Sequence, residues 1–301
     1  MTPQIQTTTE AVDQVFLLIF GISVVMLLGI AAVMVYFAVR YHHRRHPQPT
    51  SQVSSNLWLE ITWTVLPTLI VLAMFYYGWA GYLALRNVPE GAMEVKAVAR
   101  MWSWVFEYEN GRASDRLYVP VGRPVKVHLV SEDVLHSFYV PAFRIKRDMV
   151  PGMDNYVWFV APEAGSYHVF CAEYCGTGHA DMITRVEALP EGEFIAWLAR
   201  VEDEGAGGED LLRRHGCLGC HSLDGAQMAG PTFKGLYGRE KRVLSEGRER
   251  TLIVDAEYLR RSILQPKADV VVGYPPIMPD YEGRLSEEDL EAMVEFLRTL
   301  Q

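Results

Sequence analysis

The chain has 301 residues, half of them apolar, and a formal net charge of −9 at pH 7. This acidic balance argues against nucleic acid as a partner, and it is compatible with a basic redox partner or with an ordinary solvated surface. All four cysteines fall in two short motifs that also hold histidines, so none is left over for a separate disulfide framework.

Two long apolar segments dominate the first 90 residues. Residues 15–39 and 61–85 carry no charged side chain, and each exceeds the roughly 20 residues that a helix needs to cross a bilayer. The first is too long for the core of a signal peptide, and a second span follows it. We therefore expect residues 1–90 to form a transmembrane helical hairpin.

The charges beside these segments predict the orientation of the hairpin. Arg40, Arg44 and Arg45 lie between the two spans, whereas Glu10 and Asp13 precede the first. The positive-inside rule places the arginine-rich loop in the cytoplasm. Both termini and everything after residue 86 then face the outer, periplasmic side of a bacterial cell membrane.

The segment from 94 to 189 shows the pattern of a β domain. Apolar and polar side chains alternate along 125–129, and residues 156–160 form one of several short apolar runs separated by turn signals. Short strands at this spacing predict a Greek-key sandwich or barrel. We assign residues 91–204 to this domain.

A loop near the end of the β domain concentrates soft metal ligands. It holds Cys171, Cys175, His179 and Met182, and His136 lies upstream. Sulfur and imidazole favour copper, and one histidine, one cysteine and a weak methionine suit a mononuclear electron-transfer site. The second cysteine allows two thiolates to bridge two copper ions, with one histidine for each ion and with the thioether and a backbone carbonyl as weak ligands. The pattern indicates electron transfer.

Two other interpretations of these cysteines are weaker. A disulfide between Cys171 and Cys175 would leave the spacing of His136, His179 and Met182 without a reason. A structural zinc ion has little use for a thioether.

The last cysteines lie in Cys217-Leu-Gly-Cys220-His221. This spacing is that of c-type haem attachment, in which two thioether bonds hold the haem and the histidine is an axial ligand. The predicted outer location agrees, because c-type haems are attached in that compartment. The carbonyl of Pro231 is expected to orient His221 through its second ring nitrogen.

Three methionines compete for the sixth position of the haem iron. Met278 stands in a proline-stiffened loop and is the expected ligand. Met228 lies too close to His221 in sequence to reach across a haem, and Met293 falls on the apolar stripe of the last helix, where core packing explains it. Residues 205–301, which begin with a glycine-rich linker, are expected to form an all-α haem domain close to the copper domain.

With these pieces in place, the chain resembles subunit II of haem–copper cytochrome c oxidases, in the caa3-type form that carries a fused cytochrome c domain. The resemblance covers essentially the whole chain. It implies a multi-domain membrane protein with a two-helix transmembrane hairpin, a cupredoxin-like Greek-key β-barrel and a C-terminal all-α cytochrome c domain. It depends on the hairpin, His136-Ser-Phe-Tyr-Val-Pro141, Lys146-Arg-Asp-Met-Val-Pro-Gly152, the Cys171–Met182 loop and the Cys217–His221 motif.

The resemblance implies a binuclear CuA centre and a role for each ligand. The side chain of Glu173 would help to hold a magnesium ion at the interface with subunit I, or it is a solvent-facing loop carboxylate. The implied CuA ligands are Cys171 and Cys175 as bridges, His136 and His179 as terminal ligands, Met182 as a weak ligand and Glu173 through its main-chain carbonyl.

Three further residues match positions of the family. Trp102, in Met101-Trp-Ser-Trp104, matches a tryptophan through which electrons enter, although Ser103 departs from the family's Trp-Tyr-Trp and barrel packing also explains the indole. Glu60 matches a carboxylate at the cytoplasmic mouth of a proton pathway, or it is a flank residue. Asp148 matches an aspartate near subunit I with a structural or proton-related role.

The implied activity is that of an oxidase subunit. Cytochrome c or a similar donor would reduce the haem c, CuA would accept the electron, and haem a, haem a3 and CuB of subunit I would reduce oxygen while protons are pumped. The chain lacks intramembrane histidines for such a site, so it needs subunit I and other oxidase subunits. The alternatives are the CuA subunit of a nitric oxide reductase and a free-standing electron carrier. No segment resembles the propeller of nitrous oxide reductase, and the intact copper ligands exclude a quinol oxidase.

Overall fold

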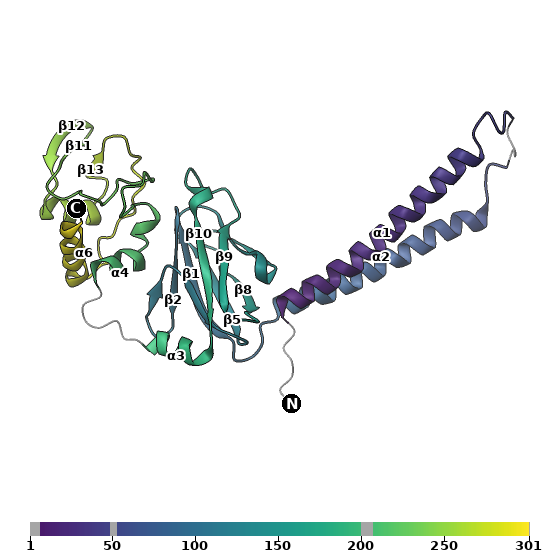
Figure 1. Cartoon of the computed structure of the whole chain (residues 1–301), viewed down its shortest axis with the longest axis horizontal. Coiled ribbons are helices and arrows are strands. Elements are labelled where there is room, and N and C mark those ends of the chain that lie inside the picture. The colour runs from purple at the N-terminus through teal and green to yellow at the C-terminus, as the bar shows by residue number, and fades with distance from the viewer. Residues whose placement is uncertain (1–6, 49–52, 200–206, 301) are drawn as a thin grey trace. The chain divides into compact units, whose positions relative to one another are not determined.

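The computed structural model describes residues 7–48, 53–199 and 207–300. The chain divides into two compact units, residues 1–89 and residues 90–301. The first holds the two long helices, and the second holds the β domain and the C-terminal domain (Figure 1).

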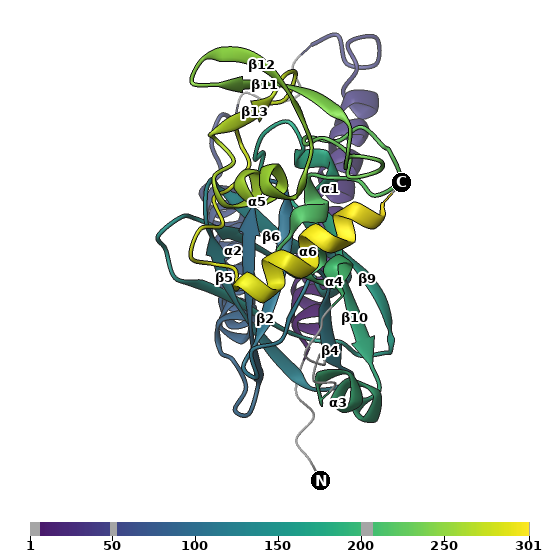
Figure 2. The ribbon, with the colours of Figure 1, turned by 90° about the vertical axis from the view of Figure 1, so that its left-hand side faces the viewer.

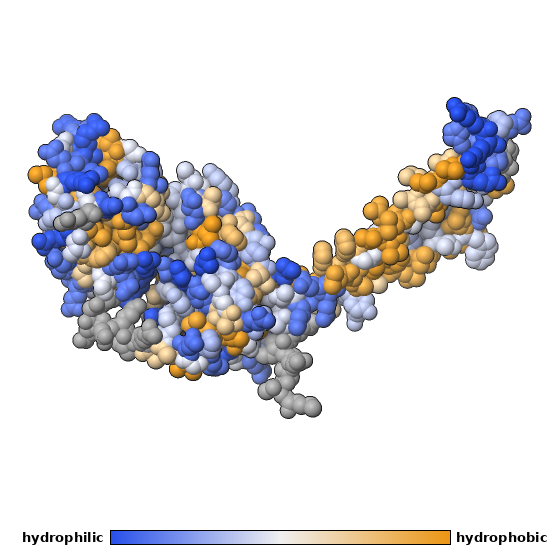
Figure 3. Space-filling model, in the orientation of Figure 1, coloured by the Kyte–Doolittle hydropathy of each residue, from blue (hydrophilic) through white to orange (hydrophobic). Residues whose placement is uncertain are grey.

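Helices α1 (Thr8–Arg40) and α2 (Leu57–Arg86) lie side by side and form the predicted hairpin. Both are long and apolar enough to cross a membrane, and their outer faces are covered with apolar side chains (Figure 3). Thr7 and Glu10 form a capping box at the start of α1, and the Asn56 side chain accepts a hydrogen bond from the Leu59 amide at the start of α2. Local caps and composition therefore explain both helices.

The β domain consists of two five-stranded sheets, with strand orders β3-β2-β1-β5-β8 and β4-β10-β9-β6-β7. Most neighbouring strands are antiparallel, but β1 is parallel to β5 and β4 is parallel to β10. The strands are β1 (Met93–Arg100), β2 (Ser103–Tyr108), β3 (Ala113–Ser114), β4 (Leu117–Pro120), β5 (Pro124–Ser131), β6 (His136–Val140), β7 (Ile145–Met149), β8 (Asn155–Val160), β9 (Gly165–Cys171) and β10 (Ile183–Leu189).

One apolar core holds the two sheets together. Inward-facing residues of both sheets are buried in it, and Phe106 of β2 meets Phe138 of β6 edge to face, with ring centroids 6.4 Å apart. Helix α3 (Glu191–Ala199) closes one end, where Trp197 stacks on Tyr118 with a centroid separation of 4.3 Å. The two sheets form the predicted barrel, and β10 runs from the loop with the predicted copper ligands at one end to α3 at the other.

The C-terminal domain is built around a second apolar core with three α-helices (Figure 2). These are α4 (Gly208–Arg214), α5 (Ala256–Leu264) and α6 (Glu287–Thr299). The Ser286 side chain caps α6 by accepting a hydrogen bond from the Asp289 amide at 3.0 Å. Met293 is fully buried on the apolar stripe of α6, in agreement with its interpretation as a core residue.

The C-terminal domain is helical but not all-α as expected, because it also contains a small three-stranded sheet. Strands β11 (Glu240–Ser245), β12 (Arg248–Ile253) and β13 (Asp269–Val271) pair in the order β12-β11-β13. Half of the side chains of β11 and β12 are charged and most are exposed, so no apolar alternation marks these strands. Glu246 and Gly247, both with positive φ, form the two-residue turn between β11 and β12.

Candidate copper and haem sites

The predicted copper ligands meet at the end of the barrel because two neighbouring strands place them there. His136 begins β6 and Cys171 ends β9, and these strands pair with Phe138 opposite Cys171. The loop from β9 to β10 carries Cys175 and His179, and Met182 closes it where its carbonyl accepts a hydrogen bond from the Cys171 amide at 3.2 Å.

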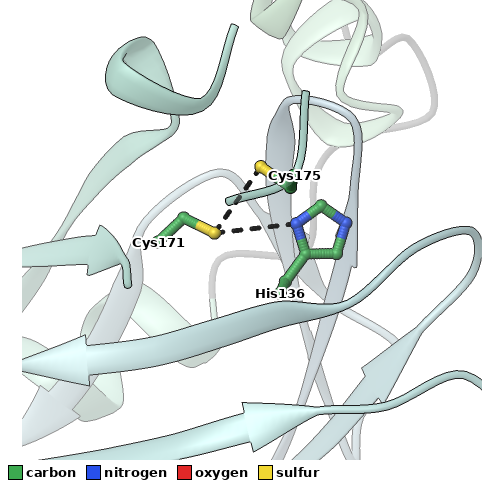
Figure 4. A group of neighbouring side chains, drawn as sticks. All are labelled: His136, Cys171 and Cys175. Atoms are coloured by element: carbon green, nitrogen blue, oxygen red, sulfur yellow. Dashed lines mark hydrogen bonds between the residues drawn. The ribbon is translucent and has the colours of Figure 1, made fainter. Parts of the chain in front are cut away.

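The donor atoms of this group are close to one another (Figure 4). The two Sγ atoms are 3.7 Å apart, and Nδ1 of His136 lies 3.7 Å from Sγ of Cys171. Sγ of Cys175 lies 3.5 Å from Nδ1 of His179 and 3.8 Å from Sδ of Met182. The Glu173 carbonyl lies 3.2 Å from Sγ of Cys171. Each thiol therefore lies beside a different imidazole. The two weak donors are also divided between the thiols, with the Met182 thioether beside Cys175 and the Glu173 carbonyl beside Cys171.

The electrostatics of the two thiols favour a bound cation. Burial alone would raise the pKa of Cys171, but hydrogen bonds involving His136 and the backbone lower it below its usual range. Burial and the charge of Cys171 raise the pKa of Cys175. One thiolate therefore forms readily and the second does not, unless a metal ion supplies the positive charge that keeps both deprotonated.

An aspartate holds the remote nitrogen of His136. Nε2 of His136 lies 2.8 Å from Oδ1 of Asp133, and the other carboxylate oxygen accepts from the Met101 amide at 2.7 Å. This contact turns Nδ1 of the fully buried imidazole toward the sulfur atoms. Asp133 was not predicted from the sequence, although a carboxylate three residues before a predicted histidine ligand is a signal that could have identified it.

The haem motif lines an apolar cavity of the C-terminal domain. Cys217, Cys220, His221 and Met278 all contribute to its wall. Nδ1 of His221 donates to the Pro231 carbonyl at 2.7 Å, as predicted, so Nε2 remains available as a ligand. Burial lowers the pKa of this imidazole, which favours the neutral form that binds iron.

A glycine makes room for the histidine of the motif. A Cβ atom at Gly230 would lie 2.6 Å from Cε1 of His221, so a larger residue would displace the imidazole. On the other side, the ring stacks on Phe233 with a centroid separation of 4.5 Å. The cavity, the two thiols and the oriented imidazole together fit a covalently attached haem.

Known protein families match all three parts of the chain. The family model described as Cytochrome C oxidase subunit II, transmembrane domain, matches residues 1–79, and the one for the periplasmic domain matches residues 112–189. The model described as Cytochrome c matches residues 206–301. The cytochrome c oxidase subunit 2 of Alkalihalophilus pseudofirmus is 33% identical over 304 residues, which cover 94% of this chain and 86% of that protein. The chain belongs to the cytochrome c oxidase subunit II family.

Two further proteins are similar over shorter parts. The alternative cytochrome c oxidase subunit 2 of Bradyrhizobium diazoefficiens is 32% identical over 226 residues, which cover 64% of this chain and 81% of that protein. The crystal structure of the periplasmic domain of subunit II of cytochrome oxidase from Bradyrhizobium japonicum has 29% identity and a TM-score of 0.37, and the match covers 39% of this chain and 99% of that one.

Membership in the family settles the general role of the chain. It is an electron-transfer subunit of a haem–copper terminal oxidase, is anchored in a membrane with a periplasmic domain, and works with other oxidase subunits. The subunit II periplasmic domain and the cytochrome c domain indicate that the cofactors are copper and haem c. The expected fold class, a two-helix hairpin followed by a cupredoxin-like barrel and a cytochrome c domain, is confirmed.

Trp102 of this subunit II lies against the loop of residues 171–182, which holds most of the predicted copper ligands and is called the copper loop below. Its indole is buried, and Nε1 donates to the Cys175 carbonyl at 3.0 Å. Cβ atoms at Gly176 and Gly178 would lie 3.0 Å and 2.5 Å from the indole, so these glycines permit its close contact with the loop. The indole thus packs in the barrel core and also contacts Cys175, one of the predicted copper ligands.

Glu173 and Asp148 share a lysine. Nζ of Lys146 lies 2.8 Å from Oε1 of Glu173 and 2.9 Å from Oδ1 of Asp148, and these contacts raise the pKa of the lysine. The Asp148 carboxylate also accepts from the buried Ser137 hydroxyl at 2.8 Å. Glu60 lies in the first turn of α2 with an exposed side chain. The bridging role of Lys146 was not predicted from the sequence, where this residue is only part of a longer motif.

Proposed function

We propose that this chain passes electrons from cytochrome c, through its own covalent haem c and a binuclear CuA centre, to the haem–copper site of subunit I in a proton-pumping oxidase. The observation that carries the proposal is the pair of thiols 3.7 Å apart, each beside a different imidazole. Copper bound to these side chains would supply a one-electron redox centre.

The chain's own residues divide the work at this centre. Cys171 and Cys175 would bridge the metal ions, and His136 and His179 would each complete one of them. Met182 and the Glu173 carbonyl are the weak donors, each within 3.8 Å of a sulfur atom. The barrel positions these groups, because four of the five side chains are buried or anchored by strand ends.

Low-temperature EPR of the full chain, with covalent haem attached and copper supplied, tests the proposal. We expect a signal from one electron shared over two equivalent copper ions, beside a low-spin haem. A mononuclear copper signal, or no copper signal, would contradict it.

Met182→Leu is expected to perturb the copper spectrum and to slow electron transfer without unfolding the barrel. Leucine fills nearly the same volume in this fully buried position, so the cost in stability should stay under about 1.5 kcal/mol. Optical and EPR spectra of the copper-loaded variant, with thermal unfolding as the control, check this. An unaltered copper spectrum would remove Met182 from the ligand set.

Asp133→Asn is expected to weaken copper binding by about ten- to hundredfold, since the carboxylate orients His136 from behind. Competition with a copper chelator measures the affinity. Asp154→Asn is a matched control, because Asp154 is an exposed carboxylate in the loop before β8 of the same barrel. Equal affinities of the two variants would show that the Asp133 contact does not support the ligand.

At the haem, Cys217 and Cys220 would form the thioether bonds, and His221 and Met278 would be the axial ligands. Two contacts support this assignment: the hydrogen bond from His221 to the Pro231 carbonyl and the presence of Met278 in the same cavity wall. Met293 also lines the cavity but belongs to the core stripe of α6, and Met228 is not among the lining residues.

Trp102 is proposed as the point where electrons enter the copper loop. Its indole donates to the Cys175 carbonyl, and its own carbonyl would lie 3.1 Å from a Cβ atom at Gly219, in the haem motif. The residue therefore touches both redox sites of the chain. Here the donor to Trp102 is the fused cytochrome c domain, which in turn would accept electrons from cytochrome c or a similar protein.

Two carboxylates are proposed to serve subunit I. Glu173 would help to hold a magnesium ion at the interface, where the ion would compete with the ammonium group of Lys146 for the carboxylate. Glu60 would mark the mouth of a proton pathway. In this proposal the membrane is the bacterial cell membrane, both termini lie outside, and the relatives favour an oxidase over a nitric oxide reductase.

A further inference from the structure

The wall of the haem cavity is not made by the cytochrome c domain alone. Arg100, Met101 and Ser103, at the turn between β1 and β2 of the barrel, also line it. Glycines of the cytochrome c domain allow this contact. A Cβ atom at Gly216 would lie 2.9 Å from Nη2 of Arg100, and one at Gly219 would lie 2.6 Å from Cβ of Ser103. The haem-binding segment thus packs on the barrel with no room for a side chain.

Arg100 is the charged residue at the centre of this contact. It ends β1, and only 11% of its side chain is exposed. Nη2 donates to the His215 carbonyl, and the guanidinium lies over the Tyr281 ring, 5.3 Å from its centroid. The Tyr281 hydroxyl donates to the same carbonyl at 2.9 Å. The Arg100 side chain therefore contacts two segments of the cytochrome c domain. One, at His215, precedes the haem motif, and the other, at Tyr281, follows Met278.

Glu132 supplies the countercharge from the barrel side. Its Oε2 atom lies 3.8 Å from Nη1 of Arg100 and 3.2 Å from Nη1 of Arg284 in the cytochrome c domain. The Glu132 amide donates to the Ala99 carbonyl at 3.0 Å, which fixes the carboxylate beside the end of β1. The carboxylate is thus shared by one arginine of each domain.

This arrangement differs from an ordinary surface ion pair. Exposed pairs contribute about 0–1 kcal/mol because water screens them. Arg100 is largely withdrawn from water, and a buried guanidinium is tolerated only where it is paired and hydrogen-bonded. Its partners here come from both domains, so separation of the domains would expose the haem cavity and leave Arg100 without the His215 carbonyl.

We propose that Arg100 and Glu132 form an ionic latch that fixes the cytochrome c domain against the β1–β2 turn, so that the barrel closes the haem pocket. Arg100 is a positioning residue, since it acts through the placement of the haem segment. Only the purpose of the latch rests on the proposed function. That purpose is to keep the haem motif next to Trp102, so that the cytochrome c domain does not move relative to the barrel. The contact itself stands on the geometry.

Hydrogen–deuterium exchange of the full chain, with haem and copper bound and in complex with the other oxidase subunits, tests the latch. In Arg100→Gln and in Glu132→Gln we expect amides of three segments to exchange about tenfold faster together: 100–103, 215–221 and 279–284. Arg116→Gln, which removes the Arg116–Glu187 pair within the barrel, is the matched control and should leave all three segments unchanged.

Salt and a conservative variant separate a latch from a merely structural arginine. Protection of the three segments in the unaltered chain should fall with ionic strength, and in Glu132→Gln it should not. Arg100→Lys keeps the charge and should recover part of the protection. Glu132→Gln and Arg284→Gln should not be additive, because they break one interaction.

Two outcomes would overturn the latch: exchange in Glu132→Gln equal to that of the unaltered chain, or faster exchange confined to 100–103. Exchange does not depend on electron transfer. Failure of the shared-electron EPR signal would therefore refute the proposed function and leave the latch to be judged on its own measurement.

Discussion

Met278→Leu should convert the haem to a five-coordinate state and lower its reduction potential by on the order of 0.1 V or more, because a thioether ligand raises the potential of a c-type haem. The substitution keeps nearly the same apolar volume in the cavity wall. The loss should therefore appear in the spin state and in a potentiometric titration, and covalent haem attachment should persist.

Met293→Leu is the matched control for this variant. Met293 lines the same cavity, but it is fully buried on α6 among Leu290, Val294 and Leu297. An exchange of apolar residues of similar volume there should cost less than about 1.5 kcal/mol and leave the potential unchanged. If Met293→Leu lowers the potential and Met278→Leu does not, the ligand assignment is reversed.

The parts of the fold that the sequence could predict are those encoded by local patterns. Apolar length alone identifies the two spans, and Ser286 followed by Asp289 identifies the start of α6. The His221–Pro231 contact was also predictable, since a histidine ligand needs a partner for its second nitrogen. In each case the deciding interactions lie within a few residues or follow from the chemistry of one group.

The parts that could not be predicted depend on pairing between distant segments. Half of the side chains of strands β11 and β12 are charged and most are exposed, so neither alternation nor burial marks these strands. The sharing of Lys146 by Glu173 and Asp148 requires β7 to lie next to the copper loop, which no periodicity encodes. The same holds for Arg100. In the sequence it is only a charged residue at the end of a strand, whereas in the structure it lines the haem cavity.

Cys175→Ser should have the largest effect at the copper site. Sγ of Cys175 lies within 3.8 Å of Sγ of Cys171, Nδ1 of His179 and Sδ of Met182, so this sulfur atom links both halves of the donor set. Serine has nearly the same shape but is a poor copper ligand, because copper sites of this kind select soft thiolates. The barrel should stay folded while the shared ligand is lost.

The variant should retain the other half of the site. Cys171 has a lowered pKa and keeps His136 beside it, which leaves a thiolate and an imidazole for a single copper ion. We expect copper content to fall from about two ions to about one per chain, with a mononuclear EPR signal. Thr177→Ala, in the same loop and exposed, should keep the shared-electron signal. A Cys175→Ser variant that still shows one electron shared over two copper ions would contradict the bridging role, since a single thiolate would then suffice to couple them.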